Sequence, residues 1–113
     1  MDSPIRVMLA QIGQPVHLRA VHAVARALRD AGMDVIFAGP HLAPDPVVAA
    51  AIQEDVDVLG VSLTNGMAAP EIAGRLHTQG AGDIIVNHLM LQETQPQEIV
   101  ETLRRLVSER GPR

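Results

Sequence analysis

The sequence predicts an α/β protein that is built on a mostly parallel sheet with helices on both faces. Short runs of apolar, largely β-branched residues alternate with longer segments of helical periodicity. The apolar runs are nearly continuous, which is typical of parallel strands that are covered on both sides. A length of 113 residues suits one domain, so we expect residues 1–113 to form a single unit.

Four segments have the composition of buried strands. Each is rich in valine, isoleucine and leucine and is followed by turn-forming residues. The predicted strands cover residues 5–11, 33–38, 56–62 and 83–86.

Four further segments have helical periodicity. The predicted helices cover residues 18–31, about 45–54, about 70–78 and about 96–109. In the first helix one face is apolar, comprising Leu18, Val21, Val24, Ala25 and Leu28. The opposite face is a basic stripe, comprising Arg19, His22, Arg26 and Arg29. Gly32 stands where a helix ends in a left-handed residue, and Asp45-Pro46 is typical of a helix start.

Composition excludes several classes of protein. The chain has no cysteine, so disulfides, zinc–thiolate sites, iron–sulfur clusters and thiol nucleophiles are excluded. A net charge of −4 and a single aromatic residue, Phe37, argue against nucleic-acid binding. No apolar run is long enough to span a bilayer and no signal peptide is evident, so we expect a cytoplasmic protein without a membrane partner.

Polar side chains gather in the segments that follow the predicted strands. Short loops and right-handed crossovers bring the carboxyl ends of parallel strands to one edge of the sheet, where such sheets bind their ligands. The residues at this edge are Gln14, His17, His41, Ser62, Thr64, Asn65, Asn87 and His88. We expect a small-molecule site there, with His22 and His77 lying outside it in solvent.

Common chemical motifs are missing from this edge. The three histidines come from three different loops without cysteine or adjacent carboxylates, which argues against a structural zinc site. Ser62 stands in Gly60-Val61-Ser62-Leu63-Thr64, which lacks the second glycine of a nucleophile elbow. Gly13 alone does not make a phosphate-binding loop. The residues by themselves thus predict a polar, histidine-bearing cleft and no specific reaction.

Three stretches of the chain resemble a known family. They read IRVMLAQIGQPVH at residues 5–17, AGMDV at residues 31–35 and DVLGVS at residues 57–62. The chain is similar there to the cobalamin-binding domain of methylmalonyl-CoA mutase and to the small subunit of glutamate mutase. The resemblance covers about the first two thirds of the chain. It implies a flavodoxin-like fold, which in that family has five parallel strands.

The resemblance also implies roles for individual residues. His17 matches the family histidine that binds cobalt from below, and Ser62 matches the serine that hydrogen-bonds the buried nucleotide base of the cofactor. The implied cofactor is cobalamin, with His17 as the metal ligand. The candidate cofactor-binding residues are Gly13, Gln14, His17, Ser62, Thr64, Asn65 and Asn87.

The chain departs from the family pattern at several positions. In the D-x-H-x-x-G motif the aspartate is replaced by Pro15 and the final glycine by Ala20. The leucine of the S-x-L motif falls on Thr64, and the paired glycine after the fourth strand reads Asn87-His88. After the fourth predicted strand the chain passes almost directly into its final helix. We therefore expect a sheet of four strands, with five strands as the alternative.

The sequence is compatible with three functions. The first is a cobalamin-binding module that acts as the small subunit of a carbon-skeleton mutase and needs a separate barrel subunit to hold the substrate. The second is a cobalamin-independent enzyme in which His17, His41 or His88 serves as acid or base in isomerising, cyclising or hydrating a small organic ligand. The third is an interaction module whose basic stripe binds an acidic partner or a second copy. We rank the cobalamin-binding module first.

Overall fold

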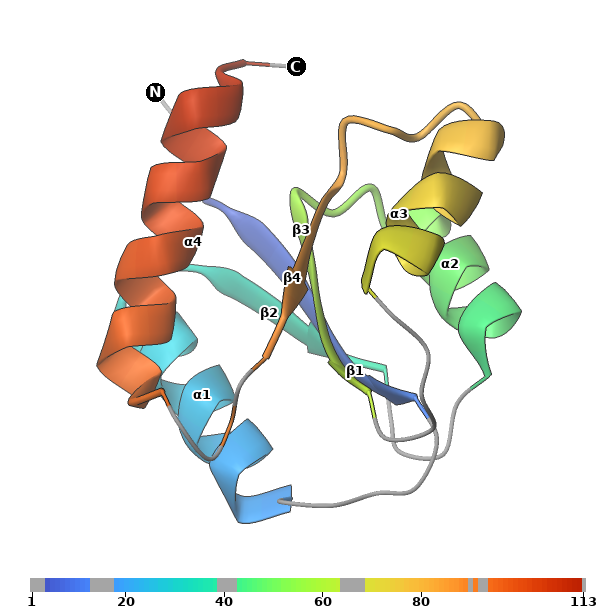
Figure 1. Cartoon of the computed structure of the whole chain (residues 1–113). Helices are drawn as coiled ribbons and strands as arrows, with labels where there is room; N and C mark the ends of the chain where they lie inside the picture. Colours follow the sequence, from blue (N-terminus) through green and yellow to red (C-terminus); the bar gives the residue numbers. More distant parts are fainter. Residues whose placement is uncertain are drawn as a thin grey trace.

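The computed structural model describes residues 4–12, 18–38, 43–63, 69–89, 91 and 94–112. Strands and helices alternate along this part of the chain (Figure 1). In order they are β1 (Arg6–Ile12), α1 (Leu18–Asp30), β2 (Asp34–Phe37), α2 (Pro44–Gln53), β3 (Val58–Leu63), α3 (Ala69–Thr78), β4 (Ile85–His88) and α4 (Pro96–Arg110).

The strands form one parallel sheet in the order β2-β1-β3-β4. The register places Leu9 opposite Phe37 on one side and opposite Gly60 on the other. Gly60 in turn lies opposite Asn87 of β4. All four carboxyl ends therefore lie along one edge, and the prediction of a four-stranded parallel α/β fold is confirmed.

The helices cover the two faces of the sheet in pairs. In Figure 1, α1 and α4 lie on one side and α2 and α3 on the other. Each pair of helices packs against one face of the sheet and forms an apolar core with it. Leu9 of β1 and Val58 of β3 pack towards α1 and α4, whereas their neighbours Met8 and Leu59 pack towards α2 and α3. This alternation along the strands assigns every strand residue to one face or the other.

The strand and helix bounds differ from the predicted ones by at most two residues. The largest shift is in β4, which begins at Ile85 because the Ile84 amide donates to Ala81 in a turn, while the Ile85 amide is the first to donate to β3. Consequently Asn87 and His88 lie inside β4, whereas the sequence predicted them in the loop that follows the strand. Ser62 lies in β3 as predicted, and the strand continues to Leu63. The helix predicted to start at Asp45-Pro46 starts one residue earlier, at Pro44 after the N-cap Ala43.

In α1, side-chain placement agrees with the predicted faces apart from Leu18. Val21, Val24, Ala25 and Leu28 are buried as expected, but Leu18 at the first position of the helix is 43% exposed. His22 is exposed as predicted, and its ring also stacks on Phe37, with ring centroids 5.5 Å apart. Gly32 has the predicted left-handed conformation, with φ at +86°.

An ion-pair network joins the amino ends of the strands to the end of α4. Asp57, just before β3, accepts a hydrogen bond from the Arg6 amide at 2.9 Å and pairs with the Arg110 guanidinium at 3.0 Å. Arg110 also donates to the backbone carbonyls of Asp57 and Asp83. The network therefore fixes α4 against β3 and β4. In the described part of the chain, no helix has the length and apolar character needed to cross a bilayer.

Candidate functional site

Two buried polar side chains lie next to each other at the carboxyl ends of the central strands. Gln11 of β1 and Ser62 of β3 are register partners, 1% and 6% exposed. By strand alternation both face α1 and α4, because Leu9 and Val58 on the same side pack there. Ser62 is a predicted site residue. Gln11 was expected only as the end of a strand, and a polar residue in an otherwise apolar strand is the signal that could have marked it.

Gly60 lies two residues before Ser62 on the same face. A Cβ atom at Gly60 would lie 3.1 Å from Leu9 Cδ2 and 3.3 Å from Leu89 Cδ2. Leu89, the residue after β4, is 4% exposed, and its amide donates to Val61 at 2.8 Å. The side chain of Leu89 thus covers Gly60 beside the hydroxyl-bearing end of β3. Neither residue was predicted to belong to the site.

Asn87 and His88 do not converge on one point. Ile85 packs into the core beneath α1 and α4, so by alternation Asn87 faces the same side as Ser62. Val86 packs into the opposite core, so His88 faces the α2 and α3 side, where it is exposed. The structure therefore brings Asn87 to the face that carries Ser62 and directs His88 away from it.

The remaining candidate residues lie outside the described part of the chain. They are Gly13, Gln14, His17, His41, Thr64 and Asn65. Among the residues that the structure does describe, no three histidine or acidic side chains are grouped so that they could hold a metal ion. The basic stripe of Arg19, His22, Arg26 and Arg29 is exposed, as predicted.

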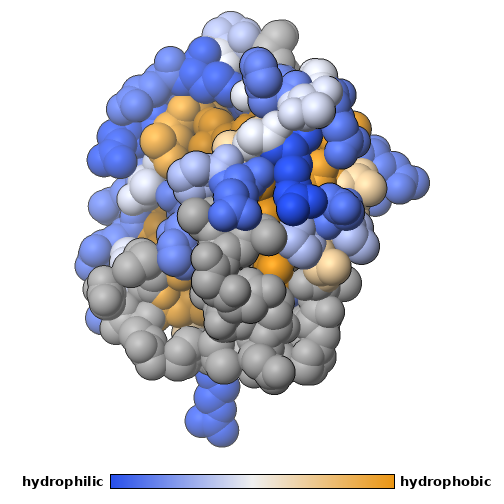
Figure 2. All heavy atoms as spheres, turned by 45° about the vertical axis from the view of Figure 1, so that its right-hand side comes forward, coloured by the Kyte–Doolittle hydropathy of each residue, from blue (hydrophilic) through white to orange (hydrophobic). Residues whose placement is uncertain are grey.

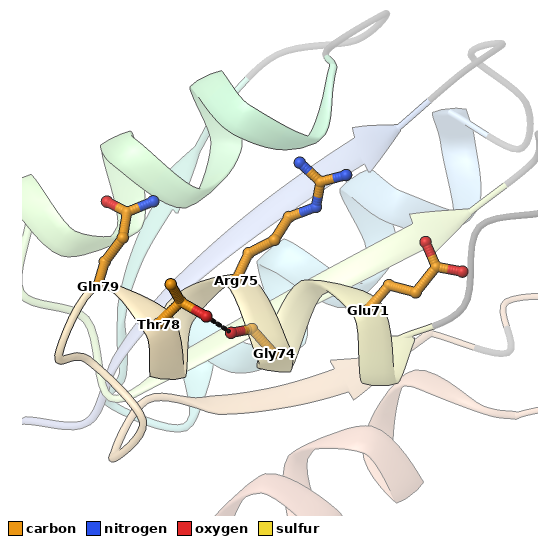
Figure 3. A pocket seen from close by; sticks show the side chains of 5 residues that line it. All are labelled: Glu71, Gly74, Arg75, Thr78 and Gln79. Atoms are coloured by element: carbon orange, nitrogen blue, oxygen red, sulfur yellow. Dashed lines mark hydrogen bonds between the residues drawn. The ribbon is translucent and has the colours of Figure 1, made fainter.

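The described pockets lie along α3 and at its carboxyl end. The larger, of about 530 Å³, is lined by Glu71, Gly74, Arg75, Thr78 and Gln79, all from α3 or the turn that follows it (Figure 3). The Thr78 hydroxyl donates to the Gly74 carbonyl at 2.9 Å within this lining. Arg75, one of the two charged residues of this lining, pairs with Asp45 of α2. The second pocket, lined in part by His77 and Asp83, lies at the amino end of β4. Neither pocket includes Ser62.

Comparison with known proteins identifies the family. Residues 5–87 match the B12 binding domain family. The 2-hydroxyisobutanoyl-CoA mutase small subunit of Aquincola tertiaricarbonis is 47% identical, and the alignment covers 99% of this chain and 98% of that protein. The pivalyl-CoA mutase small subunit of Xanthobacter autotrophicus is 40% identical over 72% of this chain and 56% of its own length.

A solved structure shows the same fold, and one sequence alignment shows that this chain is shorter than a relative. A cobalamin-binding protein from Desulfitobacterium hafniense has the same fold, with a TM-score of 0.72 over 88% of this chain and 57% of that chain, at 14% identity. The Aquincola alignment spans 134 positions, and 99% of this chain is about 112 residues, so about 22 positions of that relative have no counterpart here. By its sequence match and its flavodoxin-like fold, the chain belongs to the B12-binding domain family.

Proposed function

We propose that this chain is the small, cobalamin-binding subunit of an acyl-CoA carbon-skeleton mutase and that it works with a separate, larger catalytic subunit. The observation that carries the proposal is the match to a mutase small subunit along nearly the whole of both chains. The catalytic subunit would hold the acyl-CoA substrate. The chain itself would present the cofactor at the carboxyl edge of its sheet.

The described residues fit one part of a cobalamin molecule, the nucleotide tail. Ser62 offers a buried hydroxyl that can donate to a ring nitrogen of the nucleotide base. Gly60, two residues earlier on the same face, has no side chain to obstruct a flat ring. Leu89 now covers Gly60, so a bound base would have to displace this leucine. Asn87 supplies an amide on the same face that can bond a polar group of the tail.

His17 is the proposed cobalt ligand on the strength of the family resemblance. A neutral imidazole is a suitable ligand, and its second nitrogen normally requires an oriented hydrogen-bond acceptor. The aspartate that supplies this acceptor in the family motif is replaced here by Pro15. We infer that the cobalt is held more weakly than in relatives with the aspartate, because loss of such a partner typically costs about 10–100-fold in affinity or activity.

Each proposed residue has a limited part in the chemistry. When bound, adenosylcobalamin supplies the radical chemistry of the reaction. Ser62 and Gly60 would position the tail, and His17 would hold the cobalt. Gly13, Gln14, Thr64 and Asn65 would line the same edge. The other buried apolar side chains of this core, such as Leu9, would exclude water from the tail.

A titration with hydroxocobalamin tests the proposal. Binding through His17 should shift the visible spectrum of the corrinoid at tens of micromolar, and His17→Ala should abolish that shift. His77→Ala is the matched control, because His77 is exposed on α3 away from Ser62. No spectral change with the wild-type chain, or the same change with His17→Ala, would refute the assignment.

Ser62 is tested by affinity rather than by the spectrum. Ser62→Ala should weaken binding by about fivefold, which corresponds to one neutral hydrogen bond of about 1 kcal/mol. Ser108→Ala, on the exposed side of α4, should leave the affinity unchanged. Equal affinities of the Ser62 variant and the wild type would remove Ser62 from the site.

The cobalamin-independent enzyme remains the second candidate. Its three histidines, His17, His41 and His88, would have to meet around one substrate. Within the described residues only His88 can be placed, and it faces away from Ser62. No described contact therefore favours this function over the cobalamin-binding one.

A further inference from the structure

The outer edge of β4 is the feature that the proposed function does not use. The sheet order ends at β4, and the described residues place no strand beyond it. Flavodoxin-like sheets have the order 2-1-3-4-5, with a fifth strand on this side. The chain is also about 22 positions shorter than a relative that it matches from end to end. The edge that a fifth strand covers in this type of sheet is therefore the edge of β4 here.

The hydrogen bonds of β4 show which backbone groups point outwards. The amides of Ile85 and Leu89 donate to β3, to the carbonyls of Asp57 and Val61, at 3.0 and 2.8 Å. In a parallel ladder alternate residues direct both backbone groups to the same neighbour. Val86 and His88 consequently direct their N–H and C=O groups away from β3. Each chain thus offers two donors and two acceptors along this edge.

The edge of β4 is short, with four residues, but it carries neither a charge nor a proline that would prevent pairing. Natural edge strands are protected by short length, charged residues, proline, bulges or a covering helix or loop. Residues 84–89 read Ile-Ile-Val-Asn-His-Leu, without a charged residue or a proline. Ile85 and Val86 are only half-buried although each packs against a core cluster. Figure 1 shows β4 at the near edge of the sheet between α4 and α3, and in Figure 2 apolar atoms reach the surface between hydrophilic side chains on this side of the molecule.

We propose that two copies of this chain pair antiparallel through β4, about a two-fold axis that passes through Asn87. In this register Val86 of each copy lies opposite His88 of the other, and all four outward groups of each strand are used in four hydrogen bonds. The axis is perpendicular to the sheet, so α1 and α4 of both copies remain on one face. The result is a continuous eight-stranded sheet with a closed, isologous interface.

The strand itself favours a second copy as the occupant. Asn87 would lie opposite its own symmetry mate in a pair without backbone bonds, where side chains approach most closely. A carboxamide has both donor and acceptor atoms, so two such groups can bond to each other. Lysine or glutamate at this position would repel its mate. Asn87 can therefore form a hydrogen bond with its own symmetry mate, as a residue on the two-fold axis of a homodimer must do to be paired.

Sedimentation of the purified chain tests this interface. The contact is small and belongs to the weak class, so we expect a dimer at about 100 µM protein, with twice the mass of one 12.1 kDa chain. Val86→Pro removes an outward amide and should give a monomer. Proline is tolerated on an edge strand where the amide faces solvent, so the fold should survive.

The other edge strand supplies a matched control. The amides of Asp34 and Ala38 donate to β1, so Val35 of β2 directs its amide outwards, as Val86 does. Val35 is also half-buried. Val35→Pro should therefore leave the dimer intact. A wild-type chain that is monomeric at 100 µM, or a Val86→Pro variant that is as dimeric as the wild type, would overturn the proposal.

Hydrogen exchange and the salt dependence of the dimer give two further tests of this interface. If Val86→Pro does not fold by circular dichroism, hydrogen exchange of the wild type decides instead. The amides of Val86 and His88 should become more protected as protein concentration rises, and concentration-independent exchange at both would refute the pairing. Backbone pairing should survive 0.5 M salt, whereas a dimer that dissociates in salt would assign the contact to the basic stripe of α1. None of these outcomes depends on cobalamin.

Discussion

Leu89 and Gly60 together determine how much room the α1 and α4 side of the sheet has for a ligand. The leucine methyl groups lie 3.3 and 3.6 Å from the position of a Cβ at Gly60, so the space left by the glycine is filled. Protein interiors are packed at the density of organic crystals. A nucleotide base can therefore enter this core only if a side chain moves out of it. Leu89, at the end of a four-residue edge strand, is the side chain best placed to leave.

Leu89→Ala should tighten the binding of hydroxocobalamin by about tenfold or more. Burying a leucine side chain stabilises a protein by about 1.5–3 kcal/mol. The wild type loses this stabilisation when the base displaces Leu89, whereas the alanine variant has no leucine to displace. Equilibrium dialysis measures the effect. Cobinamide, which lacks the nucleotide tail, should bind equally to both proteins.

Leu103→Ala is the control for a general loosening of the same core. Leu103 is buried in the same cluster but comes from α4. The variant should lose about 2–5 kcal/mol of stability and keep its affinity for cobalamin. If Leu89→Ala leaves the cobalamin affinity unchanged, or alters cobinamide binding equally, Leu89 does not occupy the place of the tail.

Gly60→Ala should destabilise the chain. The added methyl group would lie 3.1 Å from Leu9 Cδ2 and 3.3 Å from Leu89 Cδ2, and overpacking of this kind costs about 1–3 kcal/mol. In the background of Leu89→Ala the cost should fall, because one of the two crowding side chains is gone. Urea unfolding of the single and double variants gives this coupling.

Gly74→Ala is the matched glycine substitution. Gly74 is exposed on α3 and a Cβ there meets nothing within 4 Å. Alanine at a helix position is better than glycine by about 0.5–1 kcal/mol, so this variant should be more stable than the wild type. A Gly60 variant that is as stable as the wild type would show that the neighbouring leucines yield freely.

At the scale of secondary structure, the sequence was sufficient for the number and order of the elements. Apolar periodicity is a local property. The pattern of β3 or α1 can be recognised within its own segment, without knowledge of the rest of the chain. Register is not local. Asn87 and His88 were expected together in a loop because no pattern shows where β4 begins to pair with β3. Their opposite faces, and the contact of Leu89 with Gly60, depend on that pairing. Ser62 was predicted from its place at the end of the third strand, and the family resemblance gave it a role.

The connection of α4 to the sheet depends on Arg110. Its guanidinium pairs with Asp57 at 3.0 Å and donates to two backbone carbonyls, and both side chains of the pair are mostly buried. Arg110→Ala should therefore cost about 1.5–3 kcal/mol in the free energy of unfolding, which is typical of hydrogen bonds to charged groups. Urea denaturation measures the loss.

Arg105 supplies the comparison on the same helix. It pairs with Glu109 one turn later, and both side chains are 64% exposed. Arg105→Ala should change the stability by no more than about 0.5 kcal/mol, as is usual for an exposed helix pair. Equal losses for the two arginines would mean that the Asp57 network does not hold α4.

At the scale of the whole molecule, the chain is a B12-binding domain. The residues that the structure describes form a sheet with one strand fewer than the five-stranded order of flavodoxin-like folds. The sequence could indicate this shortening, because the last apolar run is followed almost directly by the last helix. It could not indicate the consequence, which is an uncharged edge strand with outward backbone groups. The remaining sheet keeps the two central strands, β1 and β3, and with them the buried Gln11 and Ser62.

The capacity of the isolated chain to retain cobalamin tests the central claim most directly. After equilibrium dialysis against hydroxocobalamin, the purified chain should hold about one corrinoid per chain, with a spectrum that His17→Ala changes and His77→Ala does not. A chain that is folded by circular dichroism and yet retains no corrinoid at a ligand concentration of about 100 µM would contradict the account.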